Sequence, residues 1–94
     1  MKKVKFKSWN CLVSFGRYSN GRTAIRLIDS LDGAPVATAT VNVPDVKLAK
    51  DEVIIKNWSE NSGILRALID HDVVMDTGKK VRCGITHGYV CKII

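Results

Sequence analysis

The sequence predicts an α+β domain in which a three-stranded antiparallel meander, one short helix and a C-terminal β-hairpin surround one core. Three observations lead to this fold class. Apolar and polar residues alternate over residues 9–29, 36–43 and 81–93, which is typical of half-buried strands. Residues 60–70 instead show the spacing of one helical face. At 94 residues the chain is too short for two separate cores, so we expect a single domain over residues 1–94.

The first two strands are expected to form a hairpin around the loop of residues 19–21. If the glycine of this loop is left-handed, a three-residue loop pairs Phe15 with Ile25 and Val13 with Leu27. A two-residue turn would shift the register by one and place Phe15 opposite a charged residue. The three-residue loop keeps each face of the hairpin uniform, so we prefer it.

The third strand is expected over residues 36–43, after a turn at residues 30–34. Pro35 would open this strand, a position where its missing N–H is tolerated. The odd positions hold only Ala and Val, so they continue the apolar face of the meander. Residues 53–56 form an apolar run that is too short for a helix and rich in β-branched residues, which predicts a further strand.

One helix is expected over residues 60–70. Ser59 or Asn61 could accept backbone N–H groups at its start. At about three turns the helix would be marginal in isolation, so its apolar face must pack on the sheet. That face consists of Ile64, Leu65, Leu68 and Ile69.

The C-terminal segment is expected to form a hairpin with its loop at residues 86–88. This register places Cys83 directly opposite Cys91, at a separation where a disulfide is geometrically possible. Cys11 makes the number of cysteines odd, and the chain shows no secretory signal, so reduced thiols are the expectation.

Charge is distributed unevenly along the chain. The first 26 residues hold seven Lys or Arg and no acid, whereas all nine acids lie between Asp29 and Asp76, within a net charge of +6. Such asymmetry sets a long-range field that attracts polyanions. A tyrosine flanked by basic residues on a sheet can stack a base and neutralise phosphates. The alternatives are contact with an acidic protein surface, or a role in solubility alone. The candidate binding residues are Lys3, Lys5, Lys7, Tyr18, Arg22 and Arg26.

Neither a metal site nor a catalytic site is expected. Cys83, His87 and Cys91 have a spacing that is not a standard zinc signature, and the expected register leaves His87 at the loop tip, away from the two thiols. His87 and His71, the two histidines, are both expected to be structural. A nucleophile, a base and an orienting group do not converge, so we expect a non-enzyme without cofactors.

The location is expected to be cytoplasmic, with no membrane partner. No run reaches the roughly 18 apolar residues of a membrane span. The first seven residues also lack the apolar segment of a secretory signal.

Several segments resemble a family of small proteins of unknown function that conjugative elements and phages of gut bacteria carry. They are residues 9–13, 18–25, 35–42, 58–61 and 77–78, so the resemblance extends over most of the chain. It supplies no catalytic motif. It implies a mobile-element context, in which genes of this length often encode accessory binding proteins, including inhibitors of defence nucleases such as CRISPR effectors.

The leading expectation is therefore a non-enzymatic mobile-element protein that binds a host protein or nucleoprotein complex, as an inhibitor of a bacterial defence system. The alternative is a basic nucleic-acid-binding accessory protein in element transfer or replication. A third interpretation is a small structural subunit whose sheet edge pairs with itself.

Overall fold

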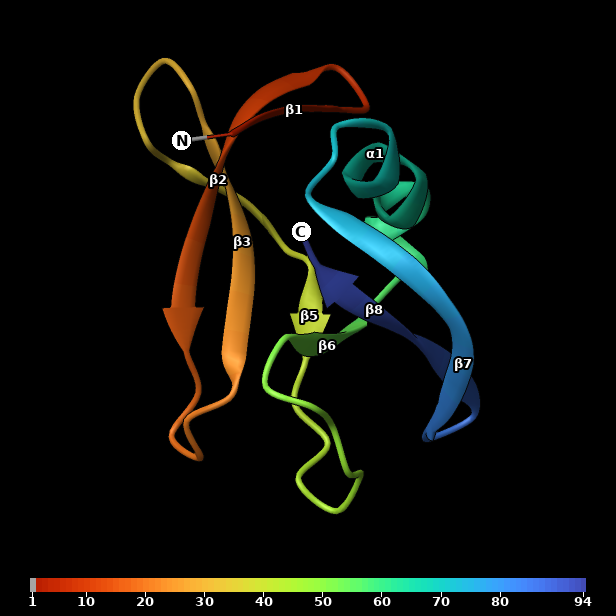
Figure 1. Ribbon diagram of the computed structural model, residues 1–94. Coiled ribbons are helices and arrows are strands. Elements are labelled where there is room, and N and C mark those ends of the chain that lie inside the picture. Colours follow the sequence, from red (N-terminus) through yellow and green to blue (C-terminus); the bar gives the residue numbers. More distant parts are fainter. Residues whose placement is uncertain (1) are drawn as a thin grey trace.

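Two antiparallel β-sheets and one short α-helix make up the part of the chain that the computed structural model describes, residues 2–94 (Figure 1). The fold is therefore α+β. The first sheet has the order β1-β2-β3-β4, with β1 (Lys3–Phe6), β2 (Trp9–Arg17), β3 (Thr23–Asp29) and β4 (Pro35–Thr38). The second has the order β5-β6-β8-β7, with β5 (Thr40–Val41), β6 (Glu52–Ile55), β7 (Val74–Cys83) and β8 (Thr86–Ile93).

The β2–β3 hairpin has the register that the sequence predicts. Phe15 lies opposite Ile25, and Val13 lies opposite Leu27. The three-residue loop closes with the glycine Gly21 at a φ of 85°, a conformation that other residues adopt only at a cost. The expected choice of turn is thus confirmed.

The strand β1 is absent from the sequence-based prediction, which treated residues 2–7 only as a basic segment. It pairs with β2 and turns Val4 and Phe6 into the core, while Lys3 and Lys5 stay exposed. The alternation is complete but short. Apolar residues alternate with lysines in β1, but the strand has only four residues, so the segment was interpreted as a basic run and not as a strand.

The expected third strand, residues 36–43, divides between the two sheets. Pro35 does open a strand, but β4 pairs with β3, whereas β5 pairs with β6. The expected meander is present as β2-β3-β4, but the prediction that residues 36–43 form one strand is wrong. At the transition, the N–H of Ala39 donates to the carbonyl of Ile25 at 2.8 Å, and its carbonyl accepts from the N–H of Lys56 at 2.8 Å. One residue thus bonds to both sheets.

The strand expected at residues 53–56 is confirmed as β6, shifted by one residue. The helix is shorter than expected: α1 covers Ile64–Asp70, and a separate 3₁₀ turn covers Ser59–Asn61. Gly63, with a φ of 92°, separates the two and prevents one continuous helix.

The expected capping residues, Ser59 and Asn61, do not cap α1. Instead the side chain of Asn57 accepts a hydrogen bond from the N–H of Leu65 at 2.9 Å. Asn61 is buried, and its amide donates to the carbonyl of Thr38 at 2.7 Å, which attaches the 3₁₀ turn to β4.

The register expected for the C-terminal hairpin is wrong. Cys83 lies opposite Thr86 and Cys91 lies opposite Asp76, so the two thiols are not cross-strand neighbours. All three cysteines are free. The turn is formed by residues 84–85, and a bulge between Asp76 and Lys79 shifts the rest of the ladder. The glycine expected in the loop, Gly88, lies in β8 instead.

The core lies between the two sheets, with α1 beside β1 at one end of the molecule (Figure 1). The expected apolar face of α1 is confirmed in that Ile64 and Leu68 are buried, while Leu65 and Ile69 are partly buried against the core. No helix among residues 2–94 has the length and hydropathy needed to cross a membrane. The other large core residues come from both sheets: Val4, Phe6, Val13, Ile25, Leu27, Val53 and Ile55.

Candidate functional site

The outer face of the first sheet carries three of the candidate binding residues. Burial of Val4 and Phe6 turns the alternate residues of β1, Lys3 and Lys5, to the outside. Arg26 of β3 lies opposite Ser14 on the same outer face and is exposed. We call Lys3, Lys5 and Arg26 the basic face.

Carboxylates do not neutralise the basic face. Within the described chain, three ion pairs form, and none of them includes Lys3, Lys5 or Arg26. Their positive charges are therefore directed to solvent and contribute to the field outside the molecule. The pairs are Lys56–Glu60 at 2.5 Å, Arg66–Asp70 at 3.6 Å and Lys92–Asp51 at 3.7 Å.

Two other candidates, Tyr18 and Arg22, bind their own chain. The Tyr18 hydroxyl lies 2.9 Å from the hydroxyl of Thr40, and also donates to the Thr40 carbonyl at 3.1 Å. The Arg22 guanidinium donates to the carbonyl of Val43 at 2.7 Å and also to that of Val46. Tyr18 thus holds β5 against the hairpin, and Arg22 holds the segment after β5, so we do not include them in the basic face.

The sixth candidate, Lys7, lies in the turn after β1. Its ammonium donates to the carbonyl of Glu60 at 2.8 Å and lies 5.2 Å from the centre of the Phe6 ring. The hydrogen bond from Lys56 holds the pKa of the Glu60 carboxyl below its usual range, and the charge of Lys7 lowers it further. Lys7 is therefore bound to the backbone of the 3₁₀ turn, and we do not include it in the basic face.

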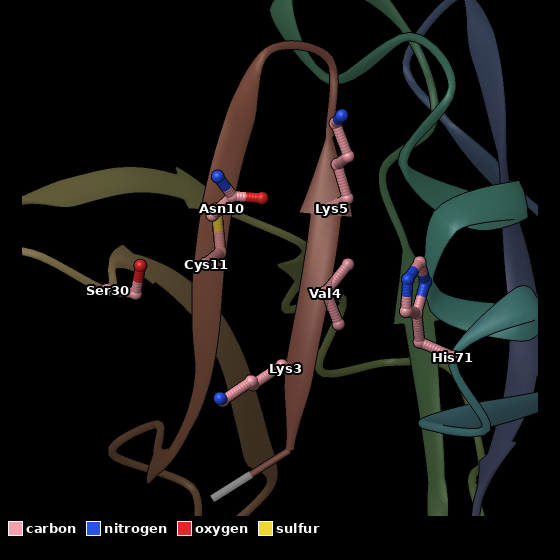
Figure 2. A pocket seen from close by; sticks show the side chains of 7 residues that line it. All are labelled: Lys3, Val4, Lys5, Asn10, Cys11, Ser30 and His71. Carbon is pink, nitrogen blue, oxygen red and sulfur yellow. The ribbon is translucent and has the colours of Figure 1, made fainter.

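A pocket of about 450 Å³ adjoins the basic face (Figure 2). In Figure 2, Asn10 of β2 and Ser30 lie on one side of β1, and His71, at the end of α1, lies on the other. The residues that line the pocket, labelled in Figure 2, are Lys3, Val4, Lys5, Asn10, Cys11, Ser30 and His71.

Two side chains of this pocket, Cys11 and His71, belong to residue types that can act in catalysis. Burial raises the pKa of the Cys11 thiol, and the charge of Asp29 raises it further, so the neutral, weakly nucleophilic form predominates. The Nδ1 atom of His71 lies 2.8 Å from the carbonyl of Ala67, which fixes the ring on its own helix. Across residues 2–94, no group of three His, Cys, Asp or Glu side chains could hold a metal ion.

Sequence reasoning missed three polar residues of this pocket. Asn10 follows the turn after β1, Ser30 follows β3, and the N–H of Ser30 donates to the carbonyl of Asn10 at 3.0 Å. Their proximity depends on the pairing of β2 with β3. The predicted β2–β3 register was sufficient to place Asn10 beside Ser30. His71, by contrast, reaches the pocket only because α1 packs beside β1.

The fold and the site together define a small α+β domain with an exposed basic face beside a pocket. No protein-family model matches the sequence, and neither the curated proteins nor the solved structures contain a match.

Proposed function

We propose that this chain is a non-enzymatic, cytoplasmic accessory protein of a mobile genetic element. In this proposal it binds a host protein or nucleoprotein complex and so inhibits a bacterial defence system, as an anti-CRISPR protein does. The resemblance described above supports the mobile-element context. The observation that supports binding is the basic face, Lys3, Lys5 and Arg26, which has no carboxylate partner in the described chain.

The charge of this face favours a nucleoprotein complex over a protein alone. Lys and Arg side chains release condensed counterions when they neutralise phosphates, which gives strong binding without base contacts. A defence nuclease bound to its guide or target presents such phosphates beside protein surface. The same observation supports the second candidate, a nucleic-acid-binding accessory protein in element transfer or replication.

A pull-down from bacterial lysate separates the two candidates. The tagged protein is used with and without nuclease treatment, and the retained material is identified. One protein that remains bound after nuclease treatment, and whose nuclease activity falls at a stoichiometric ratio, is the result expected for an inhibitor. Retained nucleic acid, with proteins lost after nuclease treatment, is the result expected for an accessory protein of transfer or replication.

A matched pair of variants tests the basic face itself. Lys3→Glu/Lys5→Glu reverses two charges on β1, and Lys79→Glu/Lys80→Glu reverses two exposed charges on β7. We expect the first variant to reduce retention at least about tenfold, because both repulsion and lost phosphate contacts act on the same site. Equal retention by wild type and Lys3→Glu/Lys5→Glu would contradict the proposed role of this face.

A further inference from the structure

The outer face of the first sheet combines positive charge with uncharged side chains. Residues directly opposite each other in an antiparallel ladder share a face. Strands β1–β4 contain one acid, Asp29, which lies opposite the buried Cys11 and is therefore on the inner face. By the same register, the uncharged residues on the outer face with Lys3, Lys5 and Arg26 include Asn10, Leu12, Ser14 and Ile28.

The outer face offers no free aromatic ring on which a base could stack. Trp9 lies opposite the buried Phe6, so both rings are on the inner face. Phe15 is also on the inner face, because it lies opposite the buried Ile25. The ring of Tyr18, in the loop after β2, is held by its hydroxyl against Thr40, which is buried. Proteins that bind single strands depend on exposed rings for stacking, so this face is poorly suited to them.

The outer face also lacks an apolar anchor for a protein partner. Leu12 and Ile28 are the large apolar residues that the register places there, and both are partly buried. Protein interfaces obtain most of their binding energy from large side chains that become fully buried at the centre. The exposed large apolar residues of the described chain are on the inner face or outside β1–β4: Trp9, Phe15, Leu31, Met75, Ile85 and Ile94.

We propose that the basic face binds the phosphate backbone of double-helical nucleic acid and does not read its sequence. The inference rests on the proposed function, and it specifies a duplex as the part of the nucleoprotein complex that this face contacts. Binding to phosphates requires cations and hydrogen-bond donors, and it requires neither stacking nor an apolar anchor. Asn10, opposite Lys5, and Ser14, opposite Arg26, add uncharged donors.

The three charges are spread along the direction of the strands. Lys3 and Lys5 are two residues apart, about 7 Å along β1, and Figure 2 shows the ammonium of Lys5 toward the β1–β2 turn and that of Lys3 away from it. The Arg26 guanidinium lies over β2 at Gly16, because a Cβ there would be 2.9 Å from its Nη1. Gly16 is four residues from Leu12, the partner of Lys3, which is about 14 Å.

This span suits the charge density of a duplex. The positions from Lys5 to the Arg26 guanidinium extend over about 20 Å along the strands. A duplex carries one phosphate charge per roughly 1.7 Å of its axis, so about twelve phosphates fall within that length. Phosphates are thus more closely spaced than the cations, and each cation can contact one without a change in the fold.

The breadth of the sheet explains why base edges are not read. Four strands about 4.8 Å apart span about 14 Å, without their side chains. The major groove is about 12 Å wide and admits a helix or a two-stranded ribbon. A four-stranded face therefore lies on the backbone across the groove, where contacts carry no direct sequence information.

A comparison of two labelled DNAs tests the proposal. A duplex and an oligothymidylate with the same number of phosphates are titrated with the protein at several salt concentrations, and label anisotropy is recorded. Three cations should give a slope of log affinity against log salt of about 2.7 for the duplex and about 2.1 for the single strand. Between 1 M and 0.1 M salt, this difference favours the duplex about fourfold. Duplexes of different sequence should bind equally.

Substitutions assign the slope to the basic face. Lys3→Ala/Lys5→Ala should lower the slope for the duplex by about 1.8, and Arg26→Ala by about 0.9, because each neutralised phosphate contributes about 0.9. Arg26→Lys retains the charge and should retain the slope. Lys79→Ala/Lys80→Ala is the control on β7 and should leave the slope unchanged. Circular dichroism of each variant verifies that the fold is retained.

The outcomes distinguish this inference from the broader function. Tighter binding of the oligothymidylate, or a marked preference for one duplex sequence, would overturn the proposal. If Lys79→Ala/Lys80→Ala lowers the slope as much as Lys3→Ala/Lys5→Ala, binding is diffuse and the basic face is not the site. If no duplex binds while a partner is still retained in the pull-down, the inference fails and the proposed function survives. If neither occurs, both fail.

Discussion

The strands β1 and β7 both lie at the edge of a sheet and both carry lysines, yet the fold uses them differently. β1 has four residues, and two of them, Val4 and Phe6, are buried in the core with residues of both sheets and α1. β7 has ten residues, of which only Val74 is buried, and a bulge interrupts its pairing.

This difference shows that positive charge alone does not make a site. The alternation of β1 directs Lys3 and Lys5 to the same face, beside the pocket. On β7, Lys79 and Lys80 are adjacent in sequence and point to opposite faces of the strand, and Lys80 lies 5.4 Å from the centre of the Tyr89 ring. A bulged, lysine-rich edge is a common protection against unwanted strand pairing, and it disfavours the interpretation as a self-pairing structural subunit.

The largest expected difference between the two edges is in stability. Phe6 is 4% exposed, so Phe6→Ala should lower the free energy of unfolding by about 3–5 kcal/mol, from lost burial and the cavity left behind. Met75 of β7 is 56% exposed, and Met75→Ala should change the free energy of unfolding by less than about 0.5 kcal/mol. Urea unfolding of both variants measures the contrast, and similar losses would mean that β1 is not anchored as described.

Two glycines give a smaller contrast between the sheets. A Cβ on Gly88 would lie 2.3 Å from Cγ2 of Ile54, a branched and buried side chain, so Gly88→Ala should destabilise the protein by about 1–3 kcal/mol. A Cβ on Gly16 would lie 2.9 Å from Nη1 of Arg26, which can swing away. Gly16→Ala should therefore be nearly neutral in thermal unfolding; equal destabilisation by both would refute this account of the two sheets.

Cys91 of β8, which lies opposite Asp76 of β7, predicts that the stability of the protein depends on pH. Burial raises the pKa of Cys91 from 9.0 to about 12, and the charge of Asp76 adds to the shift. Above pH 9 the unfolded chain loses this proton while the folded chain keeps it, so stability should fall between pH 9 and 12 by at most about 1.4 kcal/mol per pH unit. Cys91→Ala should flatten this part of the profile, with Cys83→Ala as the control. A profile that is the same in all three proteins would exclude Cys91 as the cause.

The smallest expected effect concerns the basic face itself. Lys3→Ala/Lys5→Ala and Lys79→Ala/Lys80→Ala should each change the free energy of unfolding by less than about 0.5 kcal/mol, because these exposed side chains form no ion pair in the described chain. Calorimetry of the two variants examines this. A large loss in the β1 variant alone would assign its lysines to folding and weaken their assignment to binding.

The fold was predictable where the decisive contacts are local. Gly21 and the alternating residues around it determine the β2–β3 register within one hairpin. For β7–β8, the alternation is compatible with more than one register. The structure places Gly88 against Ile54 of β6, a neighbour that the hairpin sequence does not contain. The sequence pattern of a hairpin cannot include such a neighbour.

The candidate site, like the fold, was predictable only where its contacts are local. The outward positions of Lys3 and Lys5 follow from a two-residue period around buried Val4 and Phe6. Tyr18 bonds to Thr40, a residue 22 positions away, which lies within reach only because the chain passes into the second sheet. No local pattern could show that this side chain is already occupied.

The strand transition at Ala39 has a consequence for cooperativity. Its N–H bonds to the first sheet through Ile25, and its carbonyl bonds to the second through Lys56. Opening either sheet at this point therefore breaks a bond that the other sheet shares, which couples their local unfolding. In native-state hydrogen exchange, the amides of Ala39 and Lys56 should exchange together and only through the highest-energy opening, so that both sheets behave as one foldon.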